Sequence, residues 1–351
     1  MANGWTLGIA WTLTHLLGSG EIPHADEVLA VPEETRAVAV AAHRLTDDRS
    51  TRVRDFAQRV SGPTGLIREY DDDYTRTVAE TLRSGQGNCL SQTLSFVQLA
   101  RAAGFRAEVQ DVGEALAWDR DEQTVFRTRH VNAAVRQDMR WHTVDFDPDL
   151  IGQRNPRSER ISDERALAYF YNNRAVELMV ADDWVNALRY ARRALEHATD
   201  YPGTWNTIGV IYRRAGNEDL ARQALERALD AEPQHVPALS NLVRVLEARG
   251  EEALAAEYRE TLETHRGLDP FHHFKRALDA KEREDYREAA GHIRRAIRMH
   301  DDEHRFHYAA FRIHQARGHE GRAWRALERA REQADDRQGE AYAGLLDEFR
   351  D

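Results

Sequence analysis

Apolar residues recur at the spacing of a helix in the first quarter of the chain and again directly after Cys89. The first of these regions covers residues 25–83, where Pro32 and the break at 61–63 interrupt the pattern. Gly104 follows the second region as a helix stop. Its apolar positions are Leu90, Leu94, Val97, Leu99 and Ala103. The pattern predicts several short helices and then one amphipathic helix that begins at Cys89.

Short stretches that are rich in β-branched residues follow this helix. They cover residues 107–112, 124–126, 130–135 and 141–145. Helices followed by an antiparallel sheet predict an α+β domain, which we place at residues 25–160.

The last two predicted strands form a hairpin that allows two registers. A two-residue loop at 137–138 would place His130 directly opposite Asp145. A four-residue loop at 137–140 would instead place Asp147 opposite His130, and Asp145 opposite Asn132. Directly opposed side chains in an antiparallel pair lie about 5 Å apart and diagonal ones somewhat further. Either register therefore leaves a carboxylate within reach of the imidazole, and we favour Asp145 over Asp147.

A period of 34 residues dominates the second half of the chain. Small residues return at three positions of each unit, with Phe311 as a clear departure. The sets are Ala175, Gly209, Val243, Ala277 and Phe311; Ala187, Ala221, Ala255, Ala289 and Ala323; and Ala194, Ala228, Leu262, Ala296 and Ala330. Short side chains allow two antiparallel helices to approach closely. Gly216, Gly250 and Gly318 are then expected in the turns between paired helices.

This pattern resembles the tetratricopeptide repeat (TPR), a pair of antiparallel helices. Five units cover residues 168–337, and residues 338–351 are expected to form the terminal capping helix that such arrays need. Stacked units form a groove that receives a peptide or a partner protein. Candidate groove residues are Asn172, Asn173, Arg213, Asn241 and Arg244. In the alternative, the groove only packs against the first domain.

The amino-acid composition of the chain argues against some classes of binding partner. The formal net charge of −11 argues against nucleic-acid binding, which requires a basic face. The chain has no run of about 18 apolar residues, so we expect no transmembrane helix. Residues 5–17 have the length of an export signal, but no Lys or Arg precedes Arg36. Residues 1–24 are therefore interpreted as an N-terminal helix or as a degenerate signal-like segment.

Cys89 is the single cysteine among 351 residues, so it cannot form an internal disulfide. It stands at a helix start that follows two glycines, and His130 and Asp145 come later in the chain. A thiol becomes a good nucleophile when it ionises, and a helix N-terminus and a nearby imidazolium favour ionisation. A carboxylate holds the imidazole in one orientation and tautomer. We therefore predict a catalytic set of Cys89, His130 and Asp145.

Other residues near the thiol are weaker candidates. The backbone N–H of Cys89 and the side chain of Gln86 are candidate donors to an oxyanion. Asn88, Asn132 and Trp118 are candidate pocket residues. We assign no metal ligand and no cofactor.

The motifs Gly87-Asn88-Cys89-Leu90-Ser91, Arg129-His130-Val131-Asn132 and Val144-Asp145-Phe146, together with residues 75–81, resemble the transglutaminase-like superfamily. The chain is similar, more narrowly, to bacterial proteins that join such a core to TPR units. The resemblance implies an α+β transglutaminase-like (cysteine-protease-like) domain followed by an all-α TPR superhelix. It also implies nucleophile, base and orienting roles for Cys89, His130 and Asp145. Many members have His-Ala-Trp where this chain has His130-Val131-Asn132.

These features predict a thiol-dependent acyl enzyme that forms a thioester at Cys89. A peptidase or amidase is favoured over a cross-linking enzyme, since the sequence has no dedicated calcium motif. The TPR groove would recruit a protein or peptide. The alternative is a catalytically inactive transglutaminase-like fold that serves as a TPR scaffold or adaptor. The sequence leaves the compartment open between the bacterial periplasm or cell envelope and the cytoplasm.

Overall fold

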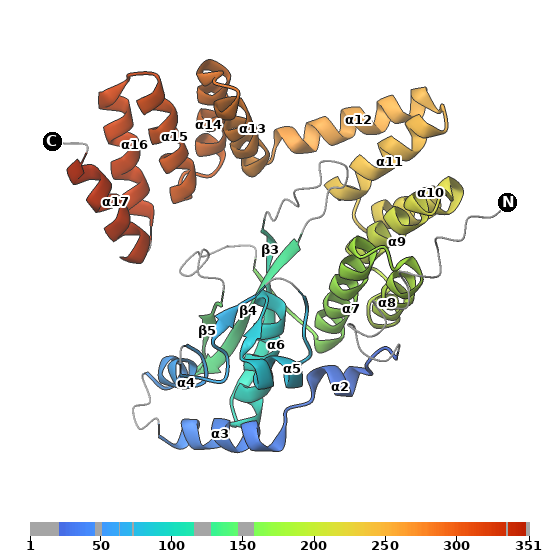
Figure 1. Ribbon diagram of the computed structural model, residues 1–351, viewed down its shortest axis with the longest axis vertical. Helices are drawn as coiled ribbons and strands as arrows, with labels where there is room; N and C mark the ends of the chain where they lie inside the picture. The colour runs from blue at the N-terminus through green and yellow to red at the C-terminus, as the bar shows by residue number, and fades with distance from the viewer. Residues whose placement is uncertain are drawn as a thin grey trace. The chain divides into compact units, whose positions relative to one another are not determined.

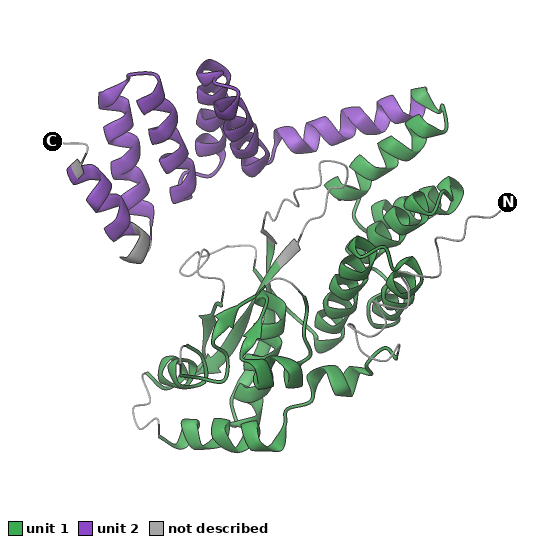
Figure 2. Ribbon diagram, viewed as in Figure 1, with its two compact units in different colours: residues 1–252 green, residues 253–351 purple. Residues whose placement is uncertain are grey.

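The computed structural model describes residues 21–45, 51–62, 64–71, 74–115, 128–146, 158–334 and 336–348. The chain divides into two compact units, residues 1–252 and 253–351 (Figure 2). The first unit contains a mixed α/β region and the first helices of the repeat array, and the second unit contains the remaining helices (Figure 1). The units therefore divide within the repeats, and the domain limits drawn from the sequence remain predictions.

The N-terminal region begins with short helices, as the apolar periodicity predicts. They are α2 (Ala25–Leu29), α3 (Glu33–Arg44), α4 (Arg52–Val60) and α5 (Val78–Ser84), and they precede α6 (Cys89–Ala102). Pro32 is the N-cap of α3, a place where its missing N–H does no harm. Two short strands, β1 (Glu69–Tyr70) and β2 (Gln86–Gly87), pair in parallel beside the start of α6.

An antiparallel sheet with the strand order β5-β4-β3-β6 follows α6. Its strands are β3 (Arg106–Ala115), β4 (Thr128–Gln137), β5 (Arg140–Val144) and β6 (Glu159–Ile161). Three of these strands lie where the sequence predicts them, and β6 is additional. The predicted strand at 124–126 lies outside the described residues.

The β4–β5 hairpin has the second of the two registers considered above. Gln137 pairs with Arg140 and Arg136 with Trp141, so the loop is Asp138-Met139. Both loop residues have positive φ, 45° and 68°, as a tight two-residue hairpin turn requires. The predicted loop at 137–138 is therefore wrong. Because the two registers differ by two residues, the same side chains still share a face of the sheet.

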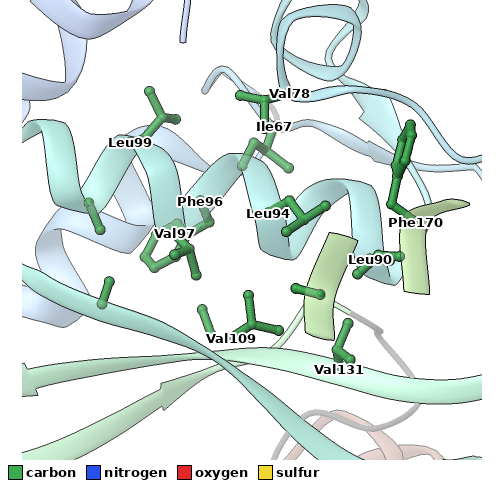
Figure 3. Close-up of a cluster of buried hydrophobic side chains, with 14 of the residues drawn as sticks. Ile67, Val78, Leu90, Leu94, Phe96, Val97, Leu99, Val109, Val131 and Phe170 are labelled. Atoms are coloured by element: carbon green, nitrogen blue, oxygen red, sulfur yellow. The ribbon is translucent and has the colours of Figure 1, made fainter. Parts of the chain in front are cut away.

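Helix α6 is enclosed on nearly all sides, which corrects the prediction of an amphipathic helix. Leu94 and Val97 belong to a large cluster that also contains Val109 and Val131 of the sheet, and Phe170 of the first repeat helix (Figure 3). Such side chains contribute about 1.5–3 kcal/mol each when fully buried. The hydroxyls that suggested a polar face are buried too, and they bond to backbone carbonyls. Thr93 bonds to Val131 O and Ser95 to Ser91 O.

The repeat region consists of consecutive helix pairs. They are α7 (Asp163–Val180) with α8 (Trp184–His197), α9 (Pro202–Arg214) with α10 (Glu218–Ala231), α11 (Val236–Ala248) with α12 (Glu252–Gly267), α13 (Pro270–Glu282) with α14 (Tyr286–Met299), and α15 (His304–Ala316) with α16 (Glu320–Gln333). Helix α17 (Asp336–Glu348) follows and covers Phe311 and Leu327 with Tyr342 and Leu346. The repeating small residues are buried, as predicted.

The turns inside the pairs repeat with the same period. Gly216, Gly250 and Gly318 have positive φ, and so do Asp182 and Glu284 at the equivalent positions of the other two units. A left-handed residue after a helix ends it and allows the chain to reverse. The prediction that these glycines lie in the turns is therefore confirmed. Asp182 and Glu284 adopt the same left-handed conformation in the two units that have no glycine at this position.

Replacing Gly209 with alanine is expected to destabilise the first unit by about 1 kcal/mol. The added Cβ would lie 2.6 Å from Cγ of Leu225, which is fully buried. Overpacking of a core costs about 1–3 kcal/mol, and the better helix propensity of alanine offsets about 1 kcal/mol of that loss. Urea unfolding measures the change.

Gly291→Ala is the matched control, since Gly291 is an exposed helix position with no atom within 4 Å of the added Cβ. It should stabilise its unit by about 0.5–1 kcal/mol. Equal effects of the two substitutions would contradict the packing explanation.

Candidate functional site

Cys89 is the first residue of α6, and Asn88 caps that helix. Asn88 Oδ1 accepts a hydrogen bond from the backbone N–H of Ser91 at 2.9 Å, and Asn88 Nδ2 donates to Thr75 Oγ1 at 2.8 Å. The N-terminus of a helix carries unpaired N–H groups and a partial positive charge. Cys89 is 9% exposed and has no disulfide partner. The thiol therefore lies at a place that favours negative charge and is close to the surface.

His130 and Asp145 meet across the β4–β5 hairpin. His130 Nε2 lies 3.0 and 2.9 Å from the two carboxylate oxygens of Asp145, and Asn132 Nδ2 donates to Oδ2 of the same carboxylate at 3.0 Å. His130 is 3% exposed. The contact is diagonal, because the observed register continued by one residue sets Asp145 opposite Asn132. Asp145 is thus the carboxylate that reaches the imidazole.

The imidazole also bonds to the thiol. Burial alone would lower the pKa of His130, but hydrogen bonds to Asp145 and Cys89 and the negative charges of both groups raise it to about 10. Because Nε2 is held by the carboxylate, Nδ1 is the ring nitrogen that remains for the thiol. The ring and the carboxylate are in direct contact, and Cys89 at the start of α6 contributes to the pKa of the same ring.

The remaining candidates lie around this set or apart from it. Gln86 is on β2, and its side-chain amide donates to Glu69 Oε2 at 2.8 Å, so its role as an oxyanion donor stays a prediction. Trp118 and Asp147 lie outside the described residues. Asn88 and Asn132 are buried, and both use their side chains to hold other site residues.

Thr75 is a site residue that sequence reasoning missed. It is 1% exposed, and its hydroxyl accepts the hydrogen bond from the cap residue Asn88. Its neighbour Arg76 donates its backbone N–H to Ser91 Oγ at 2.8 Å. The only local signal is the capping box that Thr77 and Glu80 form two residues later, which marks the start of α5.

The five residues that were predicted to line the TPR groove differ in how far they are buried. Asn172 and Asn241 are buried, whereas Asn173, Arg213 and Arg244 are partly exposed. Asn241 Nδ2 donates to Asn206 Oδ1 at 2.9 Å, which links α11 to α9. Burial, and then the like charges of Arg244 and Arg214, lower the pKa of Arg213. Helices α9, with Arg213 and Arg214, and α11, with Arg244, thus bring several guanidinium groups close together.

One face of α7 packs on the N-terminal region. Tyr169 Oη donates to Asp111 Oδ2 of β3 at 2.6 Å, and Phe170 lies in the same cluster as Leu90 (Figure 3). Helix α7 therefore packs against the N-terminal region, and the alternative that the groove only packs against the first domain stays a prediction.

The described part of the chain contains neither a candidate metal site nor a helix that could span a membrane. No group of three or more His, Cys, Asp or Glu side chains within the described ranges is arranged to hold a metal ion. Among the helices of the same ranges, none is long and apolar enough to span a bilayer.

The family match lies in the repeat half. The tetratricopeptide repeat family matches residues 178–246, and the residues before the repeats have no family assignment. The photosystem I assembly protein Ycf3 of Prochlorococcus marinus strain MIT 9303 is 32% identical over 111 residues, which are 31% of this chain and 62% of Ycf3. Ycf3 of strain MIT 9301 is 29% identical over 96 residues, which are 26% of this chain and 56% of that protein. The chain thus spans less than two thirds of these curated relatives.

Solved structures of repeat proteins match as well. MamA from Desulfovibrio magneticus RS-1 (residues 41 to the end) is 17% identical, with 49% of this chain and 96% of MamA covered and a TM-score of 0.28. YrrB, a TPR protein with an unusual peptide-binding site, is 20% identical, with 51% of this chain and 92% of YrrB covered and a TM-score of 0.28. The C-terminal half of this chain, as the family match and its helix pairs indicate, consists of tetratricopeptide repeats.

Proposed function

We propose that this protein is a thiol-dependent acyl enzyme with a transglutaminase-like core, acting as a peptidase or amidase on a protein or peptide that the TPR groove recruits. The observation that carries the proposal is the position of His130, buried between the Cys89 thiol and the Asp145 carboxylate. A thiol that performs acyl transfer is activated by an adjacent base, which a third group orients. The resemblance of the motifs around them to the transglutaminase-like superfamily supports the same assignment.

The reaction would begin from the Cys89 thiolate beside the His130 imidazolium, the pair that forms when the thiol proton passes to the ring. The thiolate attacks the carbonyl carbon, and the new C–S bond leaves a negative charge on the carbonyl oxygen. The backbone N–H of Cys89 is the nearest oxyanion donor that a helix start supplies, and Gln86 is a second candidate. Collapse expels the amine, which takes the proton from His130. Water then gives a proton to His130 and attacks the thioester, which releases the acid and restores the thiol.

The arrangement of charge favours a high reactivity of Cys89 at neutral pH. With a pKa of about 10, His130 is an imidazolium over the physiological range. An imidazolium beside a thiol stabilises the thiolate. Asp145 keeps the positive charge on the ring, and Asn132 holds Asp145 through its amide.

The repeat array would supply the partner. The cluster of Arg213, Arg214 and Arg244 favours a partner that carries carboxylate groups, because an anion would relieve the repulsion that lowers the pKa of Arg213.

Alkylation by iodoacetamide tests the proposal, since a single cysteine makes the label specific for Cys89. We expect the thiol at pH 6 to react at least about tenfold faster than a free cysteine peptide, whose thiol has a pKa near 8.5. Cys89→Ala provides the blank. A rate no greater than that of the peptide would refute the activated thiol and leave the scaffold function, for which the TPR family match is the support.

A further inference from the structure

We propose that the first repeat helix, α7, is part of the thiol site, and that Glu177 on this helix is a positioning residue for Cys89. The inference rests on the proposed function, because it concerns how the reactive thiol is held. Glu177 lies 102 positions from the residue that it contacts, Thr75, and 88 positions from the thiol.

A continuous series of hydrogen bonds connects Glu177 to the start of α6. Glu177 Oε1 accepts the backbone N–H of Thr75 at 2.7 Å. The hydroxyl of Thr75 accepts from Asn88 Nδ2 at 2.8 Å, and Asn88 Oδ1 accepts from the Ser91 N–H at 2.9 Å. Each link uses a group that is buried or nearly so, and such groups lose free energy if they are left without a partner. The cap of the helix that carries Cys89 is therefore held in place from the repeat array.

A second set of contacts holds the residues on either side of Thr75 in place. The Tyr74 ring lies between two guanidinium groups, those of Arg76 and Arg174, each 4.6 Å from the ring centroid. Arg174 also pairs with Glu177 Oε2 at 2.6 Å, and its side chain is only 8% exposed. Residues 74–76 are thus held between the first turn of α6 and the C-terminal part of α7, which leaves the segment little freedom to shift.

The orientation of the cap bears on chemistry, because Cys89 directly follows Asn88. A small rotation of the first turn would move the sulfur relative to the His130 ring, which belongs to the sheet. It would also change the direction of the N–H groups that stabilise negative charge at the helix start. We therefore expect the Cys89 thiol to lose reactivity if the contact between α7 and the start of α6 is broken.

The test is the rate of Cys89 alkylation by iodoacetamide between pH 5 and 9, in the full-length chain. Glu177→Ala removes the acceptor for Thr75, and we expect a rate about two- to fivefold lower at pH 6, with a smaller difference at pH 9 where thiols ionise without help. Glu177→Gln keeps one oxygen for the same N–H but loses the acceptor for Arg174, so it should restore part of the rate. A glutamine variant as slow as the alanine variant would overturn the role of this hydrogen bond.

Asp163→Asn is the matched control. Asp163 pairs with Arg101 at 2.6 and 2.9 Å and joins the same two helices, α6 and α7, at the end far from Cys89. It should lower the unfolding temperature and leave the alkylation profile unchanged. If alkylation of Cys89 slowed as much in Asp163→Asn as in Glu177→Ala, the effect would come from a general loss of packing between α6 and α7. That result would overturn the proposal.

Thr75→Val keeps the test decisive if Glu177→Ala does not fold. It removes the hydroxyl that Asn88 needs but leaves the backbone N–H for Glu177. We expect the same fall in rate and faster hydrogen exchange at the Ser91 amide. An unchanged profile in a folded Thr75→Val protein would overturn the inference alone, whereas a wild-type thiol that reacts like a free cysteine would refute the proposed function as well.

Discussion

Replacing His130 with alanine is expected to reduce the alkylation rate of Cys89 at pH 6 by at least about tenfold, and any hydrolytic turnover by about 100-fold or more. The imidazolium is the positive charge that bonds directly to the thiol, and it is also the proton donor to the leaving amine. Without it, a negative charge on the sulfur is stabilised only by the dipole of the helix N-terminus. Stopped-flow alkylation measures the first effect, and release of amine from a peptide library measures the second.

His142→Ala is the control for this substitution. His142 lies on β5 in the same hairpin, is exposed, and pairs with Val135 rather than with site residues. Its replacement should leave the alkylation rate within about twofold of wild type, because side chains three residues apart in a strand point to opposite faces and His142 therefore faces away from Asp145. If His130→Ala and His142→Ala behaved alike, His130 would have no part in activating the thiol, and the enzyme proposal would fail.

Asp145→Asn is expected to lower the pKa of His130 well below its wild-type value of about 10. The hydrogen bond and the negative charge of Asp145 are among the contributions that outweigh burial, and the amide supplies no charge. NMR titration of the ring protons measures the shift directly. Alkylation at pH 6 should fall by about tenfold, and the difference from wild type should shrink toward pH 9.

Asp145→Asn is also expected to change how the stability of the protein depends on pH. A folded pKa of about 10, above the ordinary value of 6.5, means that the folded state binds the proton more tightly than the unfolded state. The resulting stabilisation is fully present below pH 6.5 and is lost as the pH rises toward 10. The stability difference between wild type and Asp145→Asn should therefore decline across this window.

Asp111→Asn is the control for Asp145→Asn. Asp111 is also a buried carboxylate of the sheet, 6% exposed, and it holds Tyr169 and the Gly113 N–H. It should destabilise the protein without changing the titration of His130. A His130 pKa that stays near 10 in Asp145→Asn would contradict the assigned role of that carboxylate.

Much of this organisation could be predicted because it depends on spacing along the chain. The 34-residue period exists because every helix pair needs short side chains at the same crossing points, so Ala221 and Ala289 are recognisable from one unit to the next. The strands β3, β4 and β5 were predictable from their β-branched residues. The glycines and Asn88 before Cys89 marked a helix start, since a cap acts within a few residues of the group it satisfies.

Other features depend on contacts that local spacing does not encode. The sequence left two hairpin registers open, because only the paired strands determine which two residues adopt positive φ, and these are Asp138 and Met139. The polar side chains of α6 are buried because folding brings distant segments against them. Thr93 bonds to Val131 O of the sheet, and Gln92 bonds to Glu69 O of β1.

The sequence alone determined that a lone thiol, a histidine and an aspartate occur in that order before a set of helical repeats. The tertiary structure decided that Asp145 reaches His130 diagonally, and that Glu177 reaches the cap of the thiol helix through Thr75. The physical reason is the range of the interactions. Caps, turns and repeat periods act between near neighbours in the chain, whereas the orientation of a buried reactive group depends on residues that only folding brings together.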